Sequence, residues 1–352
     1  MSPASEQLPV LRVGTRGSEL ARTQTSAAAR ELSRAAGLHH ELEIIRTEGD
    51  VLTGSLAALG GTGVFAAALR LALLEDRVDL AVHSLKDLPT APTPGLAIGA
   101  VPVREDPRDA LCARDGLTLE QLPSGARVGT GSPRRAAQLL VARPDLEIID
   151  IRGNVPTRLA RVAGLDPKGP GDLDAVVLAA SGLRRLGLQE RITEALDPSV
   201  LLPAPGQGAL ALEVRAEVLA LDRDLARQAS GALGEPVASE RAELRSGQEE
   251  LEASLVPGLA ALNHSETRWA VTAERALLAR LEAGCAAPVG TLATLEDGML
   301  TLRVVVAAPD GSAVMRRTEA SSDLSAEAAR ELGRRVGDGL LADGAARLAG
   351  LA

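Results

Sequence analysis

The amino-acid sequence predicts an α/β protein with two similar lobes and a small α+β domain at its C-terminal end. Short runs rich in β-branched residues alternate with helical runs over roughly the first 200 residues, a pattern typical of parallel sheets covered by helices. The alternation starts again after Arg104–Arg108 (Arg-Glu-Asp-Pro-Arg), which indicates a second lobe. In the last ~85 residues the strands are grouped between two helices, as in α+β domains.

The first lobe is expected to contain four strands and two helices before the chain crosses to the second lobe. Its first helix has the clearest boundaries, because Ser18 can cap the N-terminus and Gly37 can end the helix in a left-handed conformation. The predicted strands are Leu11–Thr15, Leu42–Thr47, Asp79–His83 and Leu96–Val101, and the predicted helices are Ser18–Ala36 and Phe65–Leu74.

The second lobe repeats this pattern. Its second helix is expected to start after Asn154, which can act as an N-cap. The predicted strands are Arg127–Thr130, Leu146–Ile151 and Ala175–Ala180, and the predicted helices are Pro133–Ala142 and Val155–Ala163. A second crossing at Leu201–Gly208 then leads into one more strand, Ala209–Val214.

The C-terminal region is predicted to begin and end with a helix. Ser265 is the expected cap of the first helix, Glu266–Ala283, and Gly284 is its expected stop. Strands are expected at Val289–Leu295, Leu302–Ala307 and Ala313–Thr318, followed by a long helix from Ser325.

These elements predict three domains, the first of them discontinuous. Domain 1 would comprise residues 8–104 and 208–262, domain 2 residues 105–207, and domain 3 residues 263–352. Residues Glu217–Val256 are rich in Ala, Glu and Arg and poor in β-branched residues. We interpret them as surface helices or a partly disordered insertion, and expect no function there.

Composition excludes several classes of protein. A net charge of −9 and an aromatic content of 1% disfavour nucleic-acid binding, which needs basic surfaces or stacking platforms. No apolar run reaches the ~18–20 residues that span a bilayer, and the N-terminus does not have the pattern of a signal peptide. The two cysteines, Cys112 and Cys285, do not form a disulfide framework, so we expect a cytoplasmic protein.

One of the two lysines in the chain marks a candidate site. Among 38 basic residues only Lys86 and Lys168 are lysine, and Lys86 directly precedes Asp87 at the end of an apolar, strand-like run. Ammonium and guanidinium groups are not interchangeable, so this placement suggests a specific task. For Asp87 two interpretations are open: a turn residue before Leu-Pro, or a lone carboxylate that stabilises a cation or moves a proton.

Arginines and hydroxyl residues follow several predicted strands. Any single arginine is most simply a solvated surface charge, but five at strand ends of an acidic chain favour a cleft for a ligand with several carboxylates or phosphates. No nucleotide-binding P-loop pattern is present. The five arginines are Arg16, Arg134, Arg135, Arg152 and Arg158.

Cysteines and histidines give weaker signals. Cys285 follows the end of a predicted helix, where a thiolate is disfavoured, so a structural cysteine or a thiol trapped by a reactive electrophile are both open. Cys112 lies in an apolar context and is expected to pack in the core. His83 and His264 have no partners at metal-ligand spacing, so we predict no metal site.

Together these segments resemble the porphobilinogen deaminase (hydroxymethylbilane synthase) family. Seven motifs occur in the family's order over almost the whole chain: Val13-Gly-Thr-Arg-Gly-Ser-Glu-Leu-Ala21, Asp79-Leu-Ala-Val-His-Ser-Leu-Lys-Asp-Leu-Pro-Thr90, Arg104-Glu-Asp-Pro-Arg-Asp109, Val128-Gly-Thr-Gly-Ser-Pro-Arg-Arg135, Arg152-Gly-Asn-Val-Pro-Thr-Arg158, Pro203-Ala-Pro-Gly-Gln-Gly208 and Leu281-Glu-Ala-Gly-Cys-Ala-Ala-Pro-Val-Gly290.

The resemblance implies a fold of two periplasmic-binding-protein-like lobes plus a small α+β C-terminal domain. It implies a monomeric enzyme that joins four porphobilinogen molecules head to tail, with loss of ammonia, on a covalently bound dipyrromethane primer, and then releases the product by hydrolysis. Asp87 matches the family's catalytic aspartate, and Cys285 matches the thioether anchor of the cofactor. Its implied cofactor- and substrate-binding residues are Arg16, Ser18, Ser84, Lys86, Thr130, Ser132, Arg134, Arg135, Arg152 and Arg158.

Two positions depart from the family pattern. Thr62 stands where the family usually has a lysine in a Gly-rich loop, which removes a cation. Gly131 stands where the family often has a second hydroxyl residue. The alternative function is a non-enzymatic, two-lobed binding module for a small polyanion, which explains the arginines but gives Asp87 and Cys285 no task.

Overall fold

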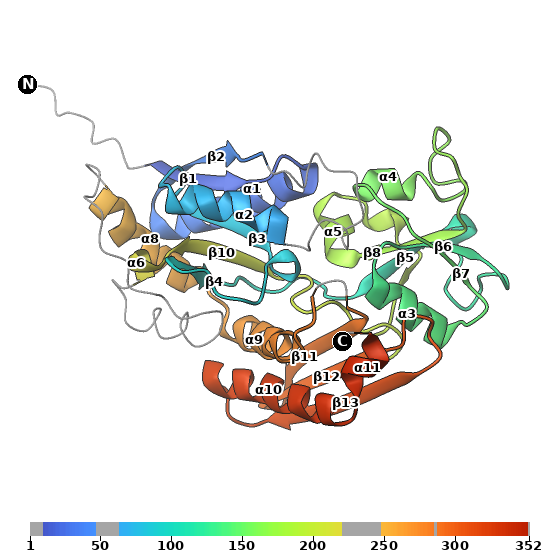
Figure 1. The fold of residues 1–352 in the computed structure, drawn as a ribbon. Coiled ribbons are helices and arrows are strands. Elements are labelled where there is room, and N and C mark those ends of the chain that lie inside the picture. Colours follow the sequence, from blue (N-terminus) through green and yellow to red (C-terminus); the bar gives the residue numbers. More distant parts are fainter. Residues whose placement is uncertain (1–9, 47–62, 220–247, 285–286, 351–352) are drawn as a thin grey trace, which may run out of the picture. The chain divides into compact units, whose positions relative to one another are not determined.

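The computed structural model describes residues 10–46, 63–219, 248–284 and 287–350 (Figure 1). These residues form two compact units. The first unit consists of the described parts of Met1–Gly54, Thr62–Val103 and Leu210–Arg268, and the second of Arg104–Ala209 and those of Trp269–Ala352. The division into three domains at the predicted boundaries stays a prediction.

The first unit contains a five-stranded sheet with the strand order β2-β1-β3-β10-β4. Four strands run in the same direction, and β10 runs antiparallel to both of its neighbours, β3 and β4. The strands are β1 (Val10–Thr15), β2 (His39–Ile44), β3 (Leu80–Ser84), β4 (Leu96–Ala100) and β10 (Leu210–Arg215).

Helices cover both faces of this sheet. On one face, α1 (Glu19–Ala36) and α8 (Gln248–Leu262) pack against the strands through buried residues such as Leu32 and Leu255. On the other face, α2 (Gly63–Leu74) packs through Leu69 and Leu73. The short α6 (Ala216–Leu219) follows β10 and belongs to the same buried cluster as α1 and α8. Both faces are apolar and largely buried, as expected for parallel strands in α/β proteins.

The segment Glu217–Val256, interpreted as surface helices or an insertion, is helical and packed in its C-terminal part. Helix α8 starts at Gln248 and buries Leu251 and Leu255 in the main core of the first unit. A Cβ placed on Gly258 would lie 2.7 Å from the Cβ of Ala36, so the two helices approach closely at this glycine. This segment is therefore part of the fold, and residues 220–247 lie outside the described residues.

The second unit contains a sheet with a matching layout, β7-β6-β8-β5-β9. Its first three strands are parallel, and β5 runs antiparallel to both neighbours. The strands are β5 (Asp109–Ala113), β6 (Arg127–Gly129), β7 (Glu147–Ile149), β8 (Ala175–Ala179) and β9 (Glu194–Ala195). Because the two five-stranded sheets share order and direction, the prediction of two similar α/β lobes is confirmed.

Helices flank this second sheet as well. Leu139 of α3 (Pro133–Ala142) belongs to one buried cluster, and Leu159 of α4 (Val155–Leu159) and Leu183 of α5 (Ala180–Arg185) belong to another. The predicted limits of α3 are confirmed, whereas α4 ends four residues earlier than predicted.

The C-terminal part of the second unit is an antiparallel sheet, β11-β12-β13, packed against helices. It confirms the predicted small α+β domain. The strands are β11 (Val289–Glu296), β12 (Met299–Ala307) and β13 (Val314–Ser321), and the helices are α9 (Ser265–Arg280), α10 (Ala326–Ala342) and α11 (Ala345–Ala349).

Helix caps show where local sequence determines structure. Ser18 caps α1 by accepting from Ala21 N, and Gly37 ends it with a φ of 67°. Ser325 caps α10 in the same way. The prediction of Ser265 as a cap is wrong, because Ser265 is inside α9 and His264 Nδ1 accepts from the backbone N–H of Thr267 at 3.2 Å.

Candidate active site

In the first unit, the predicted site residues gather at one edge of the sheet. Strands β1 and β3 are parallel neighbours, so their carboxyl ends lie at the same edge. Arg16 and Ser18 follow β1, while Lys86 and Asp87 follow β3. Such edges are where open α/β sheets bind ligands.

A single turn presents Lys86 and Asp87. After Ser84 the chain forms a short 3₁₀ turn, η2 (Leu85–Asp87), closed by a hydrogen bond from Leu88 N to Leu85 O at 3.2 Å. Leu85 and Leu88 are buried at 0% and 2% exposure, whereas Ser84, Lys86 and Asp87 are half-buried. The two leucines anchor the turn in the core, so the ammonium and carboxylate are held at the surface of the site.

In the second unit, a similar edge carries the hydroxyl residues. Thr130 follows β6 and is buried, and its Oγ1 accepts from Ser132 N at 3.2 Å. Ser132 precedes α3 without using its hydroxyl as a cap. A Cβ placed on Gly131 would lie 2.6 Å from the carbonyl oxygen of Ile151, so this backbone leaves no space for a second hydroxyl residue.

Arg134 and Arg135 are held inside the second unit by Asp109. The two guanidiniums are 3% and 6% exposed, and Asp109 is fully buried. Arg134 Nη1 donates to Asp109 Oδ2 at 2.8 Å, and Arg135 Nη2 donates to Asp109 Oδ1 at 2.7 Å. Burial opposes ionisation of Asp109, but the two charges outweigh it and lower its pKa. Gln207 Nε2 also donates to this carboxylate, at 2.9 Å.

Arg158 and Arg152 extend this positive charge to the surface. Burial, together with the positive charges of Arg135 and Arg152, lowers the pKa of Arg158 to about 10, while Asp150 partly offsets these effects. Arg158 therefore lies close enough to Arg135 and to Arg152 to be repelled by both. Arg158 Nε donates to Gly153 O at 2.8 Å, which orients its guanidinium.

The structure thus brings the predicted residues together in two sets, one in each unit. Two further predicted positions, Cys285 and Thr62, lie outside the described residues. Cys112 is buried on β5, and burial raises the pKa of its thiol to about 12, so the prediction of a packing role is confirmed.

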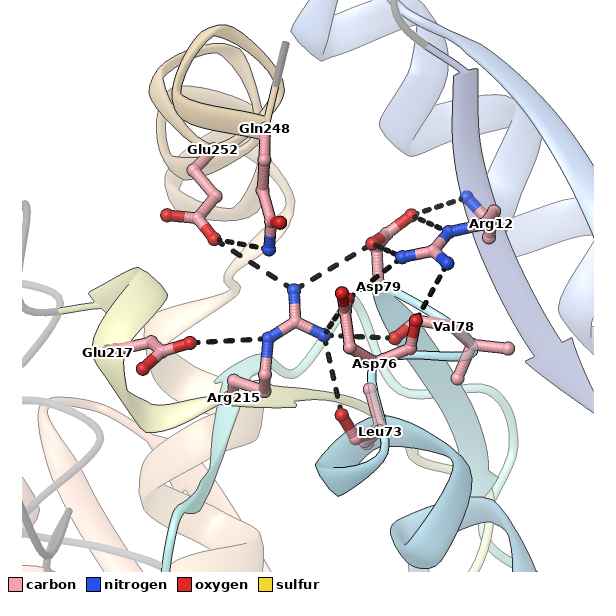
Figure 2. Close-up of polar contacts among 9 residues, drawn as sticks. All are labelled: Arg12, Leu73, Asp76, Val78, Asp79, Arg215, Glu217, Gln248 and Glu252. Atoms are coloured by element: carbon pink, nitrogen blue, oxygen red, sulfur yellow. Dashed lines mark hydrogen bonds and ion pairs between the residues drawn. The ribbon is translucent and has the colours of Figure 1, made fainter. Parts of the chain in front are cut away.

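Sequence reasoning missed several buried charges around these sets. Glu213 and Arg215 alternate with apolar residues on β10, and both side chains are almost fully buried. Arg215 lies among four carboxylates, those of Asp76, Asp79, Glu217 and Glu252, and Figure 2 shows this cluster, in which Arg12 also pairs with Asp79. Charged residues inside an otherwise apolar strand are the signal that could have revealed them.

The described residues contain neither a candidate metal-binding cluster nor a candidate membrane-spanning helix. No group of three or more His, Cys, Asp and Glu side chains there could hold a metal ion. Within the same residues, no helix is long and apolar enough to cross a membrane.

Solved structures resemble the chain only distantly. A periplasmic substrate-binding protein of an ABC transporter from Coxiella burnetii is 16% identical, with a TM-score of 0.38, over 72% of this chain and 94% of that one. The assignment of the fold class therefore rests on the sheets described above and not on this similarity.

Comparisons of the amino-acid sequence give much closer relatives. Residues 11–223 match a family model described as "Porphobilinogen deaminase, dipyromethane cofactor binding domain", and residues 269–342 match one described as "Porphobilinogen deaminase, C-terminal domain". A porphobilinogen deaminase of Micrococcus luteus is 57% identical, over 88% of this chain and 81% of that protein. One from Leifsonia xyli is 51% identical, over 99% and 97% respectively. The chain belongs to the porphobilinogen deaminase family.

Proposed function

We propose that the chain is a hydroxymethylbilane synthase in which Asp87 is the catalytic carboxylate. It would condense four porphobilinogen molecules head to tail, with release of ammonia, and then hydrolyse the linear tetrapyrrole from its primer. The turn that holds Asp87 between two buried leucines carries this assignment, because a fixed carboxylate stabilises developing positive charge better than a mobile one.

The residues of the second unit suit a dipyrromethane cofactor. That cofactor is assembled from porphobilinogen and carries acetate and propionate carboxylates. Arg158 is repelled by Arg152 and by the buried Arg135, and a carboxylate-bearing ligand would relieve this repulsion. When bound, the cofactor supplies the primer to which the substrate is joined. Thr130, Ser132 and Arg134 complete this proposed set in the second unit, and Cys285 is its proposed covalent anchor.

The first unit would supply the remaining charges. Arg16 and Lys86 are cations for substrate or cofactor carboxylates, and Ser18 and Ser84 add hydroxyl donors. Loss of ammonia from porphobilinogen leaves a positive charge on the pyrrole of the substrate. An ionised Asp87 would stabilise that charge and accept hydrogen bonds from pyrrole N–H groups.

Intact-protein mass spectrometry tests the cofactor assignment. Protein expressed where porphobilinogen is available should carry the added mass of a dipyrromethane, and Cys285→Ala should not. An unmodified wild-type protein that still binds small polycarboxylates would instead support the alternative, a non-enzymatic binding module.

Turnover of Asp87→Asn tests the catalytic assignment. This variant keeps the shape of the side chain and should lose most turnover, about 100-fold or more, while retaining the fold. Asp297→Asn, at an exposed position with a φ of 50°, is the matched control and should keep wild-type turnover. Normal turnover of Asp87→Asn would remove Asp87 from the mechanism.

The monomeric state and cytoplasmic location stay predictions. Light scattering coupled to size-exclusion chromatography should give a mass near the 36.3 kDa of one chain. Fractionation of the source cells should recover the protein with cytoplasmic markers.

A further inference from the structure

A buried carboxylate lies on β10, the strand that pairs with the strand leading into the turn of Asp87. Glu213 is on β10, 2% exposed, and β10 pairs antiparallel with β3 so that Ala81 is its register partner. In the same ladder Leu210 pairs with Ser84, the residue from which the turn departs. Glu213 is therefore three residues further along β10 than Leu210, which lies opposite the start of the turn.

Glu213 connects three elements at this place. His83, on β3, has its Nε2 3.0 Å from Glu213 Oε2, and is itself 7% exposed. Arg70, on α2, donates through Nε to Oε1 and Oε2 of Glu213 at 3.0 and 3.2 Å. Its Nη2 lies 2.9 Å from Oε1, so the carboxylate binds the guanidinium through both oxygens.

This cluster is directly connected to the catalytic turn. Only Ser84 separates His83 from Leu85, and α2, which carries Arg70, also contacts η2. Burial alone would raise the pKa of Glu213, but the adjacent His83 imidazole and the charge of Arg70 outweigh burial and lower it. An ionised carboxylate in this place holds the Arg70 guanidinium in a fixed direction and lies against the His83 ring.

We propose that Glu213, His83 and Arg70 are positioning residues that fix the turn carrying Asp87, a role that rests on the catalytic function assigned to Asp87 above. The end of β3 is tied through His83 to β10 and through Glu213 to α2. Removing this tie allows the turn to shift by fractions of an ångström, which is sufficient to misplace a carboxylate that must lie against a pyrrole cation.

Glu213→Gln is the first test, and the chain contains a matched control. Glu252 is also buried, at 1% exposure, and belongs to the Arg215 cluster of Figure 2. Arg215 and Asp79 lie at the opposite end of β3 from the turn. Glu252→Gln is therefore the same chemical change in a buried ionic cluster of the same unit, away from Asp87.

Comparison of the two variants should distinguish a loss of Asp87 positioning from a loss of fold stability. Both are expected to unfold at lower urea concentration, but only Glu213→Gln should reduce kcat, by about 10- to 100-fold with KM within about twofold. Hydrogen exchange should become faster in peptides covering residues 80–90 of Glu213→Gln and stay unchanged there in Glu252→Gln. Equal losses of kcat in the two variants, or unchanged exchange over residues 80–90, would overturn the proposal.

Two substitutions at His83 test the positioning role independently, and they can be used even if Glu213→Gln does not fold. The side-chain amide of glutamine can take the place of the histidine ring nitrogen beside Glu213 Oε2, whereas leucine offers no polar group there. His83→Gln should keep kcat within about threefold of wild type, and His83→Leu should lose as much as Glu213→Gln. Similar kcat values for the two His83 variants would exclude a positioning role.

The test distinguishes this inference from the proposed function. All variants should first be shown by intact mass to carry the same cofactor content as wild type. If Asp87→Asn is inactive and the Glu213 and His83 variants have normal kcat, only the positioning role fails. If Asp87→Asn is fully active, the catalytic role of Asp87 fails, and the positioning role with it.

Discussion

Glu274 binds both terminal nitrogens of Arg104, with Nη1 2.7 Å from Oε1 and Nη2 3.0 Å from Oε2. The same carboxylate accepts from the backbone N–H groups of Gly206 and Ala293, at 2.7 and 2.8 Å, and is fully buried. Four donors from three separate segments of the second unit thus meet at one side chain of α9. A buried charge with this many partners organises the segments around it.

Glu274→Gln should destabilise the protein strongly. It removes the charge opposite Arg104 and turns one acceptor oxygen into a donor, so we expect a loss of about 3–5 kcal/mol in the free energy of unfolding. Urea denaturation measures this. The exposed pair between Arg280 and Asp338 is the control, and Asp338→Asn should cost less than about 1 kcal/mol. Equal losses would contradict the interpretation of Glu274 as a shared buried acceptor.

Cys112 predicts an alkaline loss of stability. Burial raises the pKa of its thiol to about 12, above the value of an unfolded thiol, ~8.5. Because the folded pKa is the higher one, this contribution is fully present below about pH 8.5 and is lost as the pH rises towards 12. The loss is at most about 1.4 kcal/mol per pH unit.

This loss can be measured cleanly in this chain, which has no tyrosine and only Lys86 and Lys168 as lysines. Between pH 9 and 11 the free energy of unfolding should fall more steeply in wild type than in Cys112→Ala. Parallel curves for the two proteins would show that the thiol does not titrate on unfolding.

Gly131→Ala should perturb the second unit. Its Cβ would lie 2.6 Å from Ile151 O and 3.2 Å from Asp150 Oδ1, so the backbone must move, at a cost of about 1–3 kcal/mol. Gly17→Ala is the control, because its nearest atom would be 3.8 Å away, an ordinary contact. Chemical denaturation of both variants should show a loss for Gly131→Ala only, and an unaffected Gly131→Ala would contradict the close approach.

The two predicted hydroxyl ligands Ser18 and Ser132 should differ in their effect on stability. Ser18→Ala removes the cap of α1 and should cost about 1 kcal/mol. The hydroxyl of Ser132 does not cap α3, so Ser132→Ala should change the free energy of unfolding by less than about 0.5 kcal/mol. Thermal unfolding of the two cofactor-free variants compares them directly. A larger loss of stability for Ser132→Ala than for Ser18→Ala would contradict the assignment of Ser18, and not Ser132, as the stabilising cap.

Local signals predicted a large part of the fold. The cap at Ser18, the glycine at Gly37 and the proline that starts α3 each determine backbone structure within a few residues, and these boundaries are confirmed. Strand β2 starts three residues before its prediction because its register is set by β1, where Val10 pairs with His39. The local sequence pattern of β2 does not reveal that β1 is its partner strand.

The chemistry of the site was predicted only in part. Motifs identified Asp87 and the arginines, but not that Arg134 and Arg135 share Asp109, which is 25 residues from the first of them. The antiparallel directions of β5 and β10 were also absent from the predictions, because pairing between distant segments is not encoded in periodicity. Buried ionic pairs of this kind require the folded chain.

The place of β10 in the first sheet has a consequence for synthesis on the ribosome. Strands β3 and β4 do not pair with each other, and each pairs with β10, whose residues emerge only after the whole of β5–β9. The sheet of the second lobe, in contrast, is encoded continuously between Asp109 and Ala195. During vectorial translation the second lobe can therefore complete its sheet while the first lobe, although made earlier, still has two unpaired strand edges.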